Sequence, residues 1–99
     1  MIILIGHFRL PADKVQAARP AITRVVSATR DEPGCMKYVY AEDPDDAGLF
    51  HVSEIWTDQA SVDAHFASDH MKQWQADRQE LGMLDREITA YTTSSAKKL

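Results

Sequence analysis

Two histidines stand five positions apart in the segment "AHFASDH", residues 64–70. An imidazole can bind a metal ion or move a proton near neutral pH, because its ordinary pKa lies near 6.5. On one regular helix, however, a spacing of five residues turns the side chain of His70 about 140° away from that of His65. No third ligand is obvious nearby, so the sequence predicts no metal site.

His65 is the stronger candidate for proton transfer. Val62 and Phe66 lie next to it at helical spacing, so His65 can border the apolar face of a helix. We interpret it as a base or hydrogen-bond donor; the alternative is a surface histidine bonded to Asp69. His70 could lie at a cavity rim, one turn from Trp74, or cap a helix and face solvent.

Glu54 and Trp56 belong to the segment "LFHVSEIW", residues 49–56, whose alternation predicts a strand. Glu54 shares a face with apolar neighbours, so it must be paired or have a raised pKa. It could support catalysis by orienting a histidine, or pair with Arg9 or Arg86 on a neighbouring strand. Trp56, at the strand end, could line a cavity or fill the core.

Further aromatic and histidine residues lie on predicted strands. His7 and His51 alternate with apolar residues, and either could enter a cavity while the other faces an interface. Tyr38 and Tyr40 share a face and could line a pocket or fill the core. Cys35 has no basic residue arranged beside it, so we interpret it as a packing residue.

These side chains must be positioned by seven predicted elements. Strands are expected over residues 2–10, 35–43, 49–56 and 83–93, and helices over 12–30, 58–67 and 69–81. Pro20 should kink the first helix or remove one hydrogen bond. The order β-α-β-β-α-β is typical of the ferredoxin-like α+β fold, an antiparallel four-stranded sheet with helices on one face. Residues 1–93 form one domain and 94–99 a flexible tail.

Composition narrows the possible partners. The chain has 99 residues, a net charge of -4 and a pI near 5.4, which argues against nucleic acid as a partner. One cysteine excludes an internal disulfide and a C-x-x-C metal site, and fits a reducing cytoplasm. The apolar run 1–5 is too short for a membrane span.

The first predicted strand is apolar on both sides, although helices are expected on only one face of the sheet. This pattern predicts a homodimer packed sheet against sheet.

Three segments carry a resemblance to a known family. They are "EPGCMKY" (32–38), "SEIWTD" (53–58) and "DAHFASDHMKQW" (63–74). Together with the order of elements, they resemble the antibiotic biosynthesis monooxygenases, small proteins that form a dimeric α+β barrel. The chain looks closest to the quinol monooxygenase branch, which uses no metal, flavin or heme. The resemblance implies a homodimer and a cavity between sheet and helices, bordered by Trp56 and His65.

Some relatives of this kind degrade heme, with an Asn on the first strand, a Trp on the second helix and a ligating His further along. In this chain those positions align with His7, His65 and Gln75. The ligating histidine is missing, so the resemblance favours quinol oxidation over heme degradation and implies no cofactor.

The leading hypothesis is a cofactor-independent monooxygenase that oxidises a quinol or related polycyclic phenol with molecular oxygen. The expected catalytic residues are His65, Trp56 and Glu54. The expected substrate-binding residues are His70, Trp74, Tyr38, His7 and Phe66. Two alternatives remain open: a non-catalytic dimer that binds small aromatic ligands, and an isomerase or cyclase on the same scaffold.

Overall fold

The computed structural model describes residues 1–99 and contains the predicted order of elements. The strands are β1 (Ile2–Arg9), β2 (Cys35–Glu42), β3 (Leu49–Trp56) and β4 (Leu84–Thr92). The helices are α1 (Val15–Arg30), α2 (Gln59–Phe66) and α3 (Asp69–Leu81), and a short 3-10 helix (Ala12–Lys14) precedes α1. The α+β, ferredoxin-like prediction is therefore confirmed, with element bounds that differ by at most a few residues. The helix α1 runs through Pro20 without a break.

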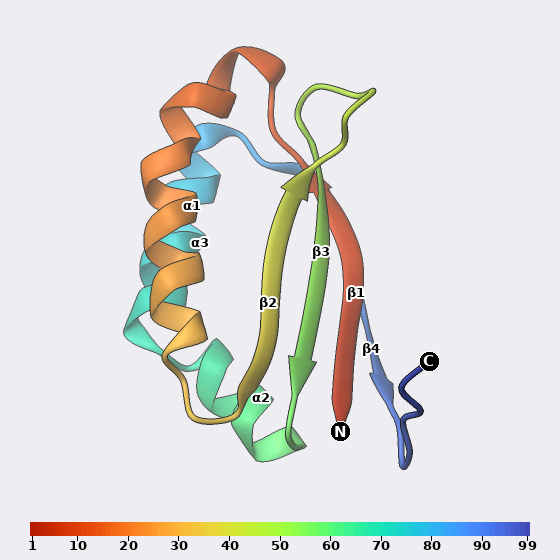
Figure 1. The fold of residues 1–99 in the computed structure, drawn as a ribbon. Coiled ribbons are helices and arrows are strands. Elements are labelled where there is room, and N and C mark those ends of the chain that lie inside the picture. Colours follow the sequence, from red (N-terminus) through yellow and green to blue (C-terminus); the bar gives the residue numbers. More distant parts are fainter.

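The four strands form one antiparallel sheet in the order β2-β3-β1-β4. Helices α1 and α3 lie against one face, and α2 lies at one end (Figure 1). Because side chains alternate across a strand, the even-numbered residues of β1 and β3 point toward the helices, as do Tyr38 and Tyr40 of β2. Glu54 of β3 is in register with Leu4 on one side and Tyr38 on the other, so it lies near the middle of the covered face.

The buried side chains on the covered face form two clusters. The larger one joins the sheet to α1 and α3 and includes Phe8, Phe50 and Trp74. The smaller one lies toward the α2 end of the sheet and consists of Ile2, Leu4, Tyr38, Trp56 and Val62. The candidate catalytic residues of β3 therefore belong to a part of the core that α2 helps to close.

The helical structure is interrupted between α2 and α3, so these are two separate helices. A side chain caps the start of each one. The Asp58 carboxylate accepts the backbone N–H of Ser61 at the start of α2, and the Ser68 hydroxyl accepts that of Met71 at the start of α3. Gly82 ends α3 in the left-handed conformation, with φ of 80°. Because of the interruption at Ala67 and Ser68, His65 and His70 belong to different helices.

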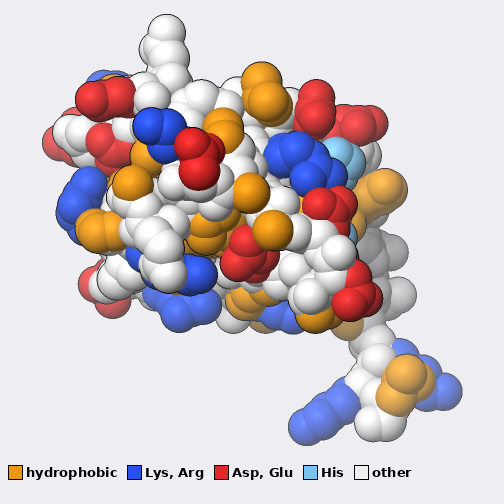
Figure 2. Space-filling model, turned by 90° about the horizontal axis from the view of Figure 1, so that it is seen from above, with side chains coloured by type: hydrophobic (Ala, Val, Ile, Leu, Met, Phe, Trp, Pro, Cys, Tyr) orange, Lys and Arg blue, Asp and Glu red, His pale blue; other side chains and the backbone are white.

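The other face of the sheet carries no helix (Figure 1). Ile5 and Tyr91 lie there with about half of their surface exposed, at 49% and 55%. His7 and His51 also lie on this face, in register with each other. Acidic and basic side chains are interspersed at the end of the molecule seen in Figure 2. None of the helices has the length and apolar character needed to cross a lipid bilayer.

Candidate functional site

The turn between α1 and β2 brings Glu32 against α2. The backbone N–H of Thr57 donates to the Gly34 carbonyl over 3.0 Å, and the N–H of Cys35 donates to the Glu32 carbonyl over 3.0 Å. Gly34 lies so close to Ser61 that a Cβ there would overlap the Ser61 side chain. This close approach needs glycine, and it holds the turn where the Glu32 side chain reaches the end of α2.

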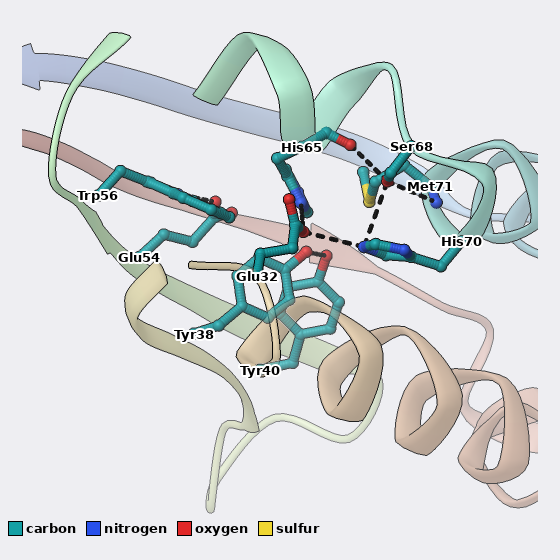
Figure 3. A network of polar contacts seen from close by, with 9 residues as sticks. All are labelled: Glu32, Tyr38, Tyr40, Glu54, Trp56, His65, Ser68, His70 and Met71. Carbon is teal, nitrogen blue, oxygen red and sulfur yellow. Dashed lines mark hydrogen bonds and ion pairs between the residues drawn. The ribbon is translucent and has the colours of Figure 1, made fainter. Parts of the chain in front are cut away.

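Glu32 joins the two histidines. Its Oε2 atom accepts hydrogen bonds from Nδ1 of His65 at 2.7 Å and from Nε2 of His70 at 2.9 Å (Figure 3). The Ser68 hydroxyl lies 3.2 Å from Nε2 of His70 and donates to the His65 carbonyl. The angular separation expected of a single helix does not apply, because the two rings come from consecutive helices. His65 is bonded to Glu32 and not to Asp69.

Glu32 is the residue that sequence reasoning missed. It lies 33 positions from His65 in the sequence. The sequence signal was its place at the start of "EPGCMKY", one of the three segments that carry the family resemblance. The structure adds it to the site as the partner of both histidines.

His65 is fully buried, with 0% of its surface exposed. Aromatic rings surround it: the ring centroids of Trp56, Phe66 and Tyr38 lie 4.7, 5.1 and 5.3 Å from that of the imidazole. Burial lowers its pKa, against the opposing effect of Glu32. Since a carboxylate only accepts hydrogen bonds, the contact places a proton on Nδ1. Nε2 of the neutral ring is then an acceptor, and it has no hydrogen-bond partner.

Glu54 is a second buried carboxyl group, with 2% of its surface exposed. Its Oε1 atom accepts the indole N–H of Trp56 at 3.0 Å. Burial raises the pKa of Glu54 to about 7, while the Trp56 bond and the positive charge of Arg86 act in the opposite direction. Arg9 instead forms a bidentate pair with Asp46, so of the two arginines suggested as partners of Glu54, Arg9 is wrong. Glu54 is thus a buried group that can exchange a proton near neutral pH.

Two tyrosines extend the site along β2. The hydroxyl groups of Tyr38 and Tyr40 form a short hydrogen bond with each other. Burial raises the pKa of both, that of Tyr40 to about 12. Both phenols are therefore neutral at physiological pH, and each can donate a hydrogen bond. Tyr38 is buried, and its ring packs edge-on against both Trp56 and His65.

The remaining predicted site residues are Phe66, Trp74 and His7, and they lie in three different places. Phe66 is 38% exposed and lies beside the His65 ring, at the outer edge of the site. Trp74 is buried in the larger core cluster, where it packs against Phe8 and Tyr40. The structure does not bring His7 to the site. It lies on the open sheet face, where it faces Glu87 at 3.7 Å.

A surface hollow of about 290 Å³ adjoins the network from outside. It reaches two site residues, Glu32 and Trp56. Its other lining residues come from the 33–34 turn, from the residue that caps α2 and from α2 itself: Pro33, Gly34, Asp58, Ala60, Ser61 and Ala64. An aromatic side chain, a carboxylate and small residues therefore meet at an open depression next to the buried imidazole.

The profile of the antibiotic biosynthesis monooxygenase family matches residues 1–77, more than half of the chain. The chain belongs to the antibiotic biosynthesis monooxygenase family. A solved structure from Deinococcus radiodurans, described as a candidate antibiotic biosynthesis monooxygenase, is 28% identical with a TM-score of 0.91 and covers 100% of this chain and 98% of that one. A similarly described protein from Nitrosomonas europaea is 22% identical with a TM-score of 0.86, over 96% and 100% of the two chains, and shows the common fold.

A further relative is an uncharacterised protein from Synechocystis. It is 24% identical over 98 residues, which is 99% of this chain and 67% of that protein. Membership of the family supports a monooxygenase-like role on a small molecule.

Proposed function

We propose that this chain is a cofactor-independent monooxygenase that oxidises a quinol or related polycyclic phenol with molecular oxygen. The observation that carries this proposal is the buried imidazole of His65, whose Nδ1–H is held by Glu32 while Nε2 has no partner. Such a ring is oriented by a carboxylate and ready to accept a proton, as a general base requires. The aromatic side chains of Trp56 and Tyr38 beside it suit a flat substrate.

The proposed reaction needs no external reductant. His65 Nε2 accepts the phenol proton, and the resulting anion gives electrons to oxygen far more readily than the neutral phenol does. The anion then takes up oxygen at an electron-rich carbon. A ring-activated CH₂ group, as in an anthrone, reacts as CH₂ + O₂ → C=O + H₂O, and a quinol with a free ring C–H reacts as quinol + O₂ → hydroxyquinone + H₂O. In both cases one oxygen atom enters the product and the other leaves as water. The protonated His65, stabilised by Glu32, returns its proton to the oxygen atom that leaves as water.

Glu54 supports the same reaction as a second site of proton exchange. Its pKa of about 7 lets it accept or donate a proton at physiological pH. The Trp56 indole orients its carboxyl group. We expect the substrate to approach the buried Nε2 of His65 past Phe66, which is the most exposed of the surrounding aromatic rings.

We also propose that two copies pair through their open sheet faces in the cytoplasm. Ile5 and Tyr91 leave apolar surface exposed on a face that no helix covers. Sedimentation of the wild-type chain should give a dimer, and Ile5→Lys should shift it toward monomer. A monomeric wild type would contradict this part of the proposal.

The deciding experiment measures oxygen uptake by chelator-treated protein with a panel of reduced naphthoquinols and anthrones, in the presence of superoxide dismutase. Uptake should scale with protein and fall about 100-fold or more in His65→Ala, the usual range for loss of a general base. Glu80→Gln is the control, because Glu80 is exposed on α3 and lies outside both the network and the open sheet face. Binding without uptake would favour a ligand-binding protein, and turnover without oxygen an isomerase or cyclase.

A further inference from the structure

The three side chains at the centre of the network converge from separate parts of the chain. Glu32 lies in the turn before β2, His65 near the end of α2 and His70 at the start of α3. One donor atom from each, Oε2, Nδ1 and Nε2 respectively, lies within 4.8 Å of the others. We propose that these three residues form a binding site for a divalent transition-metal ion such as Zn²⁺ or Co²⁺.

The spacing of the donor atoms fits such an ion. Metal–nitrogen and metal–oxygen bonds of this class measure about 2.0–2.2 Å, so two ligands at right angles lie roughly 3 Å apart. The Glu32 carboxylate oxygen is 2.7 Å from His65 Nδ1 and 2.9 Å from His70 Nε2. An ion can therefore replace the two bridging protons with only small movements of the side chains.

The chemistry of the donors also fits. Two imidazoles and one carboxylate are typical ligands of first-row transition metals and poor ligands for Mg²⁺ or Ca²⁺, which prefer oxygen. The site is open on one side, because 15% of the Glu32 side chain and 26% of the His70 side chain are exposed. Water can complete the coordination shell from that side.

The unpartnered Nε2 atom of His65 provides independent support. With a proton on Nδ1, Nε2 is a buried acceptor without a donor, among the rings of Trp56, Tyr38 and Phe66. When a metal occupies Nδ1, the ring proton moves to Nε2. An N–H group interacts favourably with aromatic rings, whereas a buried lone pair gains nothing from them. Metal binding therefore removes an unsatisfied acceptor from the core.

Metal binding has a consequence for catalysis, and this consequence alone rests on the proposed function. An ion on Nδ1 leaves a proton on Nε2, so His65 can no longer accept a proton from the substrate. Zn²⁺ should therefore inhibit oxygen uptake, and a chelator should restore it.

The test titrates the chelator-treated full-length protein with Co²⁺ and follows its visible absorption, with Zn²⁺ competition measured by calorimetry. We expect one Co²⁺ per chain, displaced by Zn²⁺. Glu32→Gln and His70→Ala should each weaken Co²⁺ binding at least 10-fold. The control matched to Glu32→Gln is Glu80→Gln, which changes an exposed carboxylate of α3 outside the network and should leave the affinity unchanged.

Circular dichroism establishes that each variant is folded, and His70→Gln, which retains bulk and polarity, replaces His70→Ala if the latter unfolds. Absence of saturable Co²⁺ binding would overturn the proposal. So would an affinity that survives Glu32→Gln and the His70 variant, or one that falls as far in Glu80→Gln as in Glu32→Gln. These readouts use no substrate. Failure of the metal site is thus distinguishable from failure of the proposed oxidation.

Discussion

Glu32 and Glu54 carry two carboxyl groups on the same side of the sheet, and their hydrogen-bond partners differ in whether they can carry a charge. Glu32 lies in a turn and contacts the rings of His65 and His70. Glu54 lies on a central strand, almost fully buried, and its one hydrogen-bond donor is the neutral indole of Trp56. The partners of Glu32 are imidazoles, which can become cations and then stabilise its negative charge. Glu54 lies where burial disfavours the charged form of its carboxyl group.

The difference assigns the two groups different tasks. A carboxylate bonded to an imidazole N–H orients the ring and stabilises its protonated form, as Glu32 can do for His65. A carboxyl group whose pKa is raised to about 7 can itself gain or lose a proton at physiological pH, as Glu54 can. Neighbouring residues of the same type thus acquire distinct roles from their surroundings.

Among variants that keep His65, the largest effect is expected for Glu32→Gln. The amide keeps the shape of the side chain but loses the charge-assisted bonds to both histidines, which are worth about 2–3 kcal/mol in folding free energy. Turnover in the oxygen-uptake assay should fall about 100-fold, because His65 loses the partner that holds its proton on Nδ1. Glu80→Gln, at an exposed position on α3, is the control. Equal turnover in the two variants would remove Glu32 from the mechanism.

The next effect concerns the pH dependence of stability. The pKa of Glu54 rises on folding from 4.5 to about 7, so the folded state holds more protons in this window and stability falls as pH rises through it. Above pH 7 the penalty is on the order of 3 kcal/mol. Urea unfolding should show Glu54→Gln close to wild type at pH 4 and more stable than wild type at pH 8. Parallel pH profiles would show that Glu54 has an ordinary pKa.

His70→Ala should have a smaller effect than Glu32→Gln. His70 is partly exposed, and Glu32 retains its bond to His65 when His70 is absent. We expect a loss of about 1 kcal/mol in unfolding free energy and a decrease in turnover of less than about 10-fold in metal-free protein. A decrease as large as that of His65→Ala would mean that both rings act directly on the substrate.

The smallest effect is expected for His51→Ala. His51 lies on the open sheet face, where it contacts Asp43 at 2.8 Å with about half of its side chain exposed. Exposed ion pairs contribute little, so the unfolding free energy should change by less than about 1 kcal/mol. Turnover should equal that of wild type. A large loss of activity would show that the open face takes part in the reaction.

The fold was predictable because it depends on local patterns. Alternation in 49–56 and helical spacing in 69–81 identified elements that the structure contains with the same bounds. Side-chain alternation along β1 shows which residues share a face, but it does not show which of the two faces meets the helices. The sequence therefore left the location of His7 open, and the structure places it on the open face.

The site was less predictable because its decisive contact is not local. His65, Trp56 and Glu54 stood out by type and neighbours, and the structure places them together with Tyr38. The one partner that the sequence suggested for His65 was Asp69, four residues away, under the alternative interpretation of a surface histidine. The hydrogen-bond partner in the structure is Glu32, in a turn 33 residues earlier. No periodicity links a turn to a helix that far along the chain, so only the packing of that turn against α2 reveals the pair.

Gly34 makes one surface turn unusually intolerant of change. A methyl group at this position would overlap Ser61 and push the turn away from α2. In a library of single substitutions, position 34 should therefore behave like a core position, while the neighbouring exposed positions 31 and 33 accept many residues. The pattern of tolerated substitutions in such a library would then identify the contact between the turn and α2, which is the contact that positions Glu32. This result would not require that the substrate be known.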